Sequence, residues 1–235
     1  MSARLIEPAL VVELERFSTP TILNGLKRLG LRPSDMEMTD RAAVRCTSPR
    51  LGVRCGFAVT RKVATGREPR PLAAGEAPRP TMADALRDML TQPAPRFLVV
   101  ENVGDYLGNV CIWGELGAEM NKAMGCQAGL TNGPVRDVAE MEAVGFQTFS
   151  GGPGLGGGFV DTLEIGGEVT VGGLTARNGD LLHGDEHGVV KIPVSMAADL
   201  PDAMRAHDAH ERRIIDLCHS GEFSVDALLD LFRQP

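Results

Sequence analysis

The 235-residue sequence has few aromatic residues and no long run of apolar or basic residues. Phe, Trp and Tyr together make up 4% of the chain. The longest apolar run is far short of the roughly 20 residues that a membrane helix needs, and residues 1–4 lead into a Glu-containing helix rather than a signal sequence. The net charge is −7, without a Lys or Arg cluster. We therefore expect neither membrane association nor nucleic-acid binding.

The sequence also lacks the cysteine patterns of a disulfide framework or a zinc site. Its five cysteines are odd in number and form no C-x-x-C pair. This distribution predicts reduced thiols in a cytoplasmic protein. No G-x-S-x-G elbow and no Cys–His–acid signature is present, so the sequence gives no support to a covalent hydrolase.

The hydrophobic residues, 43% of the chain, follow alternating helical and strand patterns. Helices are expected at residues 6–17, 21–29, 82–90, 118–124, 138–144, 203–218 and 225–232. Strands are expected at residues 97–103, 126–130, 146–149, 159–165, 168–171, 180–182 and 189–192, with short strands within 44–63. This order predicts one α/β domain over residues 1–235 with a C-terminal helical arm from about residue 196.

The most informative segment is Thr131-Asn-Gly-Pro-Val-Arg136-Asp137, between an expected strand and an expected helix. Ligands in α/β proteins bind where strands hand over to helix N-termini. An Arg beside an Asp suits an anionic oxygen substrate held together with a hard cation. Alternatively, Asp137 caps the helix and Arg136 pairs with a surface acid. The spacing leaves both interpretations open.

Two other motifs could carry chemistry. The tract from Gly151 to Gly158 contains G-x-G-x-x-G, but a strand pattern follows where a dinucleotide site needs a helix. We interpret it as a flexible loop bordering a ligand site. His183 and His187 could be metal ligands, but strands flank them and a hairpin turn over residues 184–188 is the simpler interpretation.

A family resemblance rests on three groups of residues. They are Gly114-Glu-Leu, Gly125-Cys-Gln-Ala-Gly and Asn132-Gly-Pro-Val-Arg-Asp137. The likeness continues in Asn178-Gly-Asp and in residues 184–193. The sequence resembles the family that joins class II pyruvate aldolases, which act on 4-hydroxy-4-methyl-2-oxoglutarate, with the regulator of ribonuclease E activity.

The resemblance implies a β/β/α swivelling-type fold, assembled as a homotrimer or homohexamer with active sites between subunits. It implies that Asp137 binds Mg²⁺ or Mn²⁺ directly, that Glu115 holds a metal-bound water, and that Arg136 contacts the keto oxygen of pyruvate. Backbone amides near Gly114, Leu116 and Gly117 would help to bind the pyruvyl group. Glu211 of a neighbouring subunit would complete the water shell of the metal.

The implied reaction is retro-aldol cleavage of a 4-hydroxy-2-keto acid to pyruvate. The same site would also decarboxylate oxaloacetate, because both routes pass through an enolate. The alternative is a non-catalytic regulator that binds a protein partner. The chain departs from the aldolases in two respects. It has no Lys or Arg between Arg136 and Arg177 to hold a distal carboxylate, and it has Gly117 where a larger apolar residue often stands.

Overall fold

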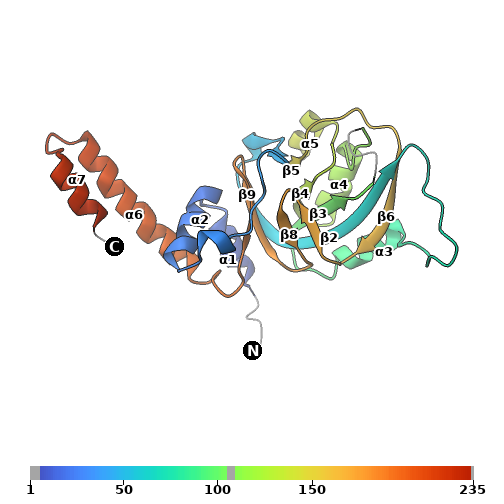
Figure 1. Cartoon of the computed structure of the whole chain (residues 1–235), viewed down its shortest axis with the longest axis horizontal. Helices are drawn as coiled ribbons and strands as arrows, with labels where there is room; N and C mark the ends of the chain where they lie inside the picture. The colour runs from blue at the N-terminus through green and yellow to red at the C-terminus, as the bar shows by residue number, and fades with distance from the viewer. Residues whose placement is uncertain (1–5, 105–108, 234–235) are drawn as a thin grey trace.

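The computed structural model describes residues 6–104 and 109–233 and has an α/β fold, as the sequence predicts. Its main sheet has eight strands in the order β1-β5-β4-β3-β2-β9-β10, and β6 pairs with β2 outside this path. The sheet is strongly curved, so that it nearly closes on itself (Figure 1). A separate hairpin, β7-β8, packs against it.

The elements alternate along the chain in the expected way. The helices are α1 (Pro8–Leu14), α2 (Thr19–Arg28), α3 (Met82–Met89), α4 (Glu115–Ala123), α5 (Val138–Val144), α6 (Leu200–His219) and α7 (Val225–Phe232). The strands are β1 (Arg45–Cys46), β2 (Arg54–Gly66), β3 (Arg96–Asn102), β4 (Cys126–Thr131), β5 (Gln147–Ser150), β6 (Phe159–Ile165), β7 (Val169–Val171), β8 (Leu174–Ala176), β9 (Leu181–Asp185) and β10 (Gly188–Ile192).

Strand β2 is the longest strand of the sheet, and the prediction of several short strands there was wrong. It pairs in parallel with β3 on one side and antiparallel with β9 and then β6 on the other. Gly56 lies inside the strand without interrupting it. A Cβ at this position would lie 2.8 Å from the Pro95 carbonyl oxygen, so a larger residue would not fit. The glycine thus permits a close backbone approach inside a continuous strand.

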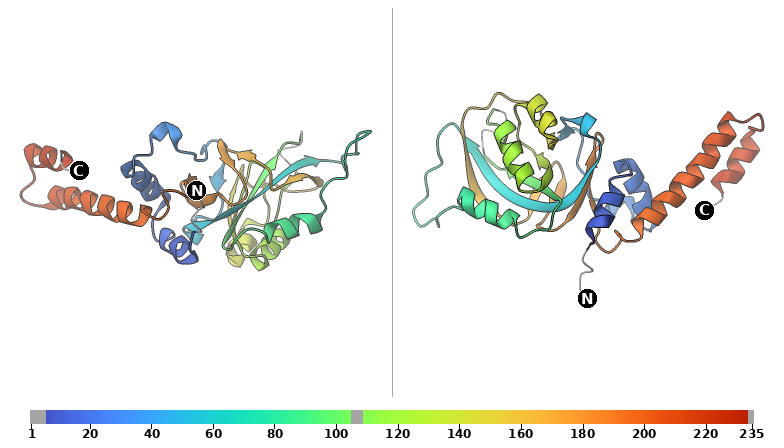
Figure 2. Two further views of the ribbon diagram at one scale, coloured as in Figure 1. Left: turned by 90° about the horizontal axis from the view of Figure 1, so that it is seen from below. Right: turned by 180° about the vertical axis from the view of Figure 1, so that it is seen from behind.

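Three apolar clusters hold the elements together. One fills the space between the sheet and β7-β8, a second packs α1, α2 and the start of α6 on β9 and β10, and a third lies between the sheet and α3, α4 and α5. Figure 2 shows α3, α4 and α5 together on one face of the sheet. Burial of each large side chain, such as Phe97 or Phe146, contributes roughly 2 kcal/mol, and the third cluster fixes α4 and α5 under the candidate site.

Local signals fix most helix ends. Thr81 and Asp84 form a reciprocal capping box at the start of α3. Gly145 ends α5 in the left-handed conformation, as predicted. Helix α2 begins at Thr19 with Ser18 as its N-cap, one residue before the expected cap, because the Ser18 hydroxyl accepts the Thr21 N–H.

Helices α6 and α7 form an arm that projects away from the sheet (Figures 1 and 2). Only the first residues of α6 are buried, and α7 has no buried residue. Among the helices of the described part of the chain, none combines the length and apolarity needed to cross a membrane.

Candidate functional site

The residue at the centre of the candidate site, Asp137, has a strained backbone. It has φ 53° and ψ 45°, and it is the one non-glycine residue with positive φ in residues 6–104 and 109–233. Asp adopts this left-handed conformation more readily than most residues, but at a cost of about 1 kcal/mol. Such strain persists where the surrounding structure enforces it, and it is common in ligand-binding turns.

The Asp137 carboxylate does not cap α5, so the capping interpretation is wrong for that helix. Its Oδ2 instead accepts the backbone N–H of Glu115 at 3.2 Å and lies 3.4 Å from Arg136 Nε. The predicted start of α4 at residue 118 was also wrong. The helix begins at Glu115, because a carboxylate 22 residues later in the chain satisfies its first N–H.

Glycines on two segments make room for this arrangement. A Cβ on Gly114 would collide with Asp137 Oδ2 and would lie 2.8 Å from Arg136 Cγ. Gly156, with φ 85°, passes over the guanidinium, and its Cβ would lie 3.0 Å from Arg136 Nη1. Hydrogen bonds between the Gly151–Gly158 loop and the turn hold the two together, from Val135 N to Gly152 O at 3.1 Å and from Gly154 N to Val135 O at 2.8 Å.

The glycine tract therefore borders the Arg136–Asp137 turn, and strand β6 follows it rather than a helix. This geometry does not suit a dinucleotide, whose pyrophosphate requires free N–H groups at a helix N-terminus. The sequence interpretation of the tract as a loop beside the site agrees with its position.

An open depression of about 480 Å³ lies over these residues. It is lined by Val110, Cys111, Ile112, Trp113, Gly114, Glu115, Leu116, Gly117, Met120, Arg136, Asp137 and Gly156–Gly158. All the predicted site residues except Glu211 are thus brought together. The first N–H groups of α4 have no acceptors within the helix. They point out of its N-terminal end, beside the depression.

Cys111 lies in the wall of the depression, a position that sequence reasoning did not single out. Burial raises the pKa of its thiol, although the nearby Arg136 partly opposes the shift. The thiol is therefore protonated at neutral pH, which does not suit a nucleophile.

The donor set fits a hard cation that keeps most of its water. Asp137 uses Oδ2 for its contacts with Glu115 and Arg136, and Oδ1 accepts no hydrogen bond from a described residue. Glu115 is exposed beside it. No group of three His, Cys, Asp or Glu side chains within the described ranges could hold a metal alone. Mg²⁺ is commonly bound by one or two carboxylates with waters and substrate oxygens, so this set matches Mg²⁺ or Mn²⁺.

Glu211 lies apart from the other predicted site residues. It is on α6, where its Oε1 lies 3.1 Å from His207 Nε2, and α6 is on the opposite side of the molecule from α4 and α5 (Figure 1). One chain alone does not bring it to Asp137. Its participation from a neighbouring subunit stays a prediction.

The second candidate pair, His183 and His187, belongs to a buried hydrogen-bond network. His183 Nδ1 lies 3.0 Å from Thr19 Oγ1, and Nε2 lies 3.2 Å from the Leu14 carbonyl oxygen. Burial lowers the pKa of His183 to about 4. Asp185 accepts the Thr19 N–H at 2.8 Å and the His187 N–H at 2.9 Å. These groups join α2 to the β9-β10 hairpin, and they do not form a metal centre.

The protein is thus an α/β protein with a strongly curved sheet and an open depression at the turn between β4 and α5. A family model described as "RraA-like: Aldolase/RraA" matches residues 19–191. The chain belongs to this RraA-like family, whose description joins aldolases and RraA proteins.

Individual relatives are distant. A crystal structure of an uncharacterized protein from Pseudomonas syringae has a TM-score of 0.70 at 21% identity, over 94% of this chain and 93% of that one. Streptomyces coelicolor RraAS2, described as an unusual member of the RNase ES inhibitor RraA protein family, has a TM-score of 0.66 at 21% identity, over 89% and 96%. These similarities establish the fold alone.

The sequence is also 28% identical to the uncharacterized protein MJ0644 of Methanocaldococcus jannaschii over 135 residues. This match covers 57% of the present chain and 64% of the relative. The chain therefore spans less than two thirds of the length of that protein.

Proposed function

We propose that this protein is a divalent-metal-dependent lyase that cleaves a 4-hydroxy-2-keto acid by a retro-aldol reaction to release pyruvate, and that it also decarboxylates oxaloacetate. The observation that carries the proposal is the strained Asp137, held against Arg136 and the N-terminus of α4 at an open depression. A surface salt bridge alone would not need a left-handed aspartate or a glycine cradle.

The chain's own groups are arranged for a developing enolate. Arg136 would donate hydrogen bonds to the keto oxygen as negative charge grows there during C–C cleavage. The N–H groups of Leu116 and Gly117, in the first turn of α4, would hold the adjacent carboxylate of the 2-keto acid.

Asp137 would bind Mg²⁺ or Mn²⁺ directly, and Glu115 would hold it through water; when bound, the ion supplies Lewis-acid stabilisation of the same oxygen. Gly156 of the Gly151–Gly158 loop lies close to the Arg136 guanidinium, while the Arg136 side chain stays 55% exposed and open to a ligand. Because Glu211 can reach this site only from another copy, the proposal includes a homotrimer or homohexamer.

The test is a coupled assay of pyruvate release from oxaloacetate and from a panel of 4-hydroxy-2-keto acids. We expect turnover with Mg²⁺ or Mn²⁺ and none after chelation. Arg136→Gln should reduce turnover by roughly 100-fold or more. Arg50→Gln is the matched control, because Arg50 is 88% exposed and lies 3.9 Å from Glu142 on α5. Absence of turnover across the panel with metal present would refute the proposal.

One observation favours a second candidate, the non-catalytic regulator. The projecting arm exposes apolar side chains that no described element covers, including Phe223, Val225 and Phe232. Such a surface fits either another copy of the chain or a protein partner. A stoichiometric partner whose binding survives Asp137→Ala would favour this function over the lyase.

A further inference from the structure

A second cavity adjoins the depression. It has a volume of about 160 Å³ and lies between the sheet, α3 and α4. Its lining is mainly apolar and consists of Arg61, Val63, Met82, Leu86, Leu98, Val100, Ile112, Trp113, Gly117, Met120, Asn121, Val160 and Thr162. Four of these residues, Ile112, Trp113, Gly117 and Met120, also line the depression. The two spaces therefore meet at these four residues.

Arg61 is the cationic residue of this cavity. On β2 it alternates with Val59 and Val63, whose side chains are buried in the apolar cluster beneath α3 and α4. Within residues 6–104 and 109–233, no hydrogen bond or ion pair reaches its guanidinium. Burial lowers the pKa of Arg61, and the electrostatic effects of Cys126 and Asp88 partly oppose that shift.

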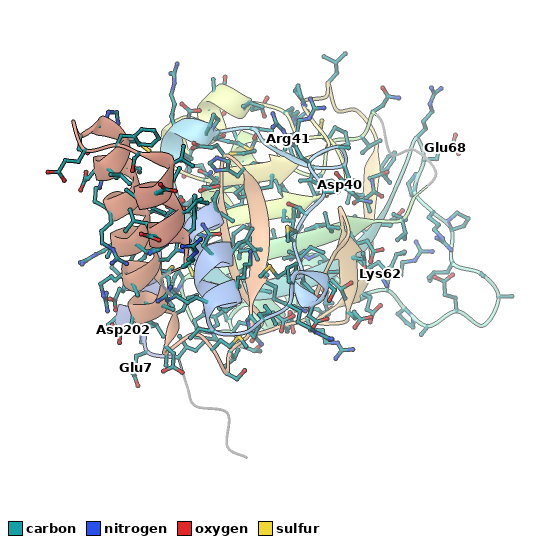
Figure 3. The ribbon with its side chains drawn as sticks, turned by 60° about the vertical axis from the view of Figure 1, so that its left-hand side comes forward. Glu7, Asp40, Arg41, Lys62, Glu68 and Asp202 are labelled. Atoms are coloured by element: carbon teal, nitrogen blue, oxygen red, sulfur yellow. The ribbon has the colours of Figure 1, made fainter. Side chains whose placement is uncertain are left out.

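The neighbouring cation shows the contrast. Lys62, whose side chain is labelled in Figure 3, follows Arg61 on β2 and so lies on the opposite face of the strand. Its Nζ lies 3.7 Å from carboxylate oxygens of both Glu101 and Glu164. One of two adjacent cations thus has two acidic partners, and the other faces an apolar cavity with none.

Arg61 is partly buried, and its guanidinium is open to solvent without a partner from the described residues, so it is available to an anionic ligand. Trp113 adds a second unsatisfied donor, since its Nε1 is buried without a hydrogen-bond acceptor. Trp113 Nε1 is closed to solvent, so Arg61 is the group of this cavity wall that can meet a ligand carboxylate.

We propose that Arg61 and this cavity form a specificity site for a substrate whose 2-keto acid end lies in the depression and whose other end is a carboxylate on an apolar chain of several carbons. This inference rests on the proposed lyase function for the position of the keto acid end. Gly117 belongs to both spaces, and any side chain there would come 2.9 Å from Trp113 Cβ. A larger residue would crowd the place where the two spaces meet.

The Arg61 site would supply the cation for a distal substrate carboxylate that the comparison with the aldolases did not find in this sequence. The segment between Arg136 and Arg177 supplies no cation, but strand β2 places one beside the same depression. Arg61 precedes Gly114, the first residue of the three family motifs, by 53 residues, so comparison of those motifs does not include it.

Calorimetry with Mg²⁺ and three unreactive probes tests the site. The probes are pyruvate, 2-oxoheptanoate and 2-oxoheptanedioate; the last two have the same length and differ in the distal carboxylate. We expect the wild type to bind 2-oxoheptanedioate about 30-fold more tightly than 2-oxoheptanoate. Arg61→Met should remove this preference, Arg61→Lys should keep part of it, and Lys62→Met should keep it in full.

The outcomes separate the two proposals. Arg61→Met should leave pyruvate affinity unchanged and keep a cooperative thermal unfolding transition, which shows that the variant folds. Equal binding of the two seven-carbon acids by the wild type, or an equal loss in Lys62→Met, would overturn the Arg61 site. If the wild type fails to bind pyruvate but keeps an Arg61-dependent preference for 2-oxoheptanedioate, the lyase proposal fails and the Arg61 site stands.

Discussion

Two regions of the protein place an acid and a base beside the start of a helix, and they differ in how completely these groups are satisfied. At α2, Asp185 is 3% exposed and accepts N–H groups from Thr19 and His187. At α4, the Asp137 side chain is 39% exposed and has one weak backbone hydrogen bond and one ion pair.

The difference is the one expected if Asp185 holds the fold together and Asp137 serves the proposed reaction. Burial alone would raise the pKa of Asp185, but its hydrogen bonds from Thr19 and His187 lower it below the ordinary value. The fold holds this network in place, and the Asp185 carboxylate already accepts hydrogen bonds from both Thr19 and His187. Asp137 is strained, open to solvent and incompletely bonded, which is what a group that must accept a ligand requires.

The largest expected effect comes from making the same change in both regions. Asp137→Asn keeps a residue that tolerates the left-handed conformation but removes the charge, so turnover should fall about 1000-fold with little change in stability. Asp185→Asn should keep turnover of the folded enzyme but cost about 2 kcal/mol of unfolding free energy. Assays of pyruvate release and urea unfolding would measure both. Equal loss of activity in the two variants would contradict the comparison.

The next effect is the pH dependence of stability in the α2 region. The pKa of His183 is about 4 in the folded protein, below its ordinary value of 6.5, so between these values only the unfolded chain takes up the proton. The contribution of the neutral His183 to the free energy of unfolding is complete above pH 6.5. It is lost as the pH decreases toward 4, by about 3 kcal/mol in total. Urea unfolding at pH 7 and pH 5 measures this loss, and His183→Gln should flatten it. An unchanged slope in that variant would assign the dependence to other groups.

A smaller effect is expected from filling the glycine cradle. Gly114→Ala places a Cβ against the Asp137 carboxylate and should reduce turnover about 30-fold by displacing it. Gly221→Ala is the control, because nothing lies near its Cβ position. If Gly114→Ala keeps full turnover, the position of the Asp137 carboxylate does not matter for the reaction.

The smallest effect should come from Cys111→Ala, although this thiol lines the depression. Because the thiol is protonated, we expect turnover to stay within about threefold of the wild type. Steady-state kinetics, together with insensitivity of the wild type to a thiol-blocking reagent, would check this. A larger loss would give Cys111 a direct part in the chemistry.

Much of the fold could be predicted because its signals are local. The Thr81 cap, the Gly145 stop and the extent of α7 all follow from residues a few positions apart. Turn chemistry also placed the β9-β10 hairpin, although its turn is tighter than expected, since Asp185 pairs with Gly188.

The errors arose where distant residues decide local structure. Helix α4 begins at Glu115 because of Asp137, and β2 is continuous because β3, β6 and β9 pair along its whole length. The motif predicted a site at Arg136, Asp137 and Glu115, and the structure brings these three residues together. Arg61 was not found, because its significance depends on the absence of partners in three dimensions.

The length of β2 has a consequence for the motion of the protein. This strand pairs Cys55 with His183 of the structural network and, six residues later, presents Arg61 to the cavity. Its amide protons should therefore be among the slowest to exchange with solvent, since opening them requires separation of both neighbouring strands. Ligand-dependent protection confined to the Arg61 half would show that the two regions open independently along a single strand.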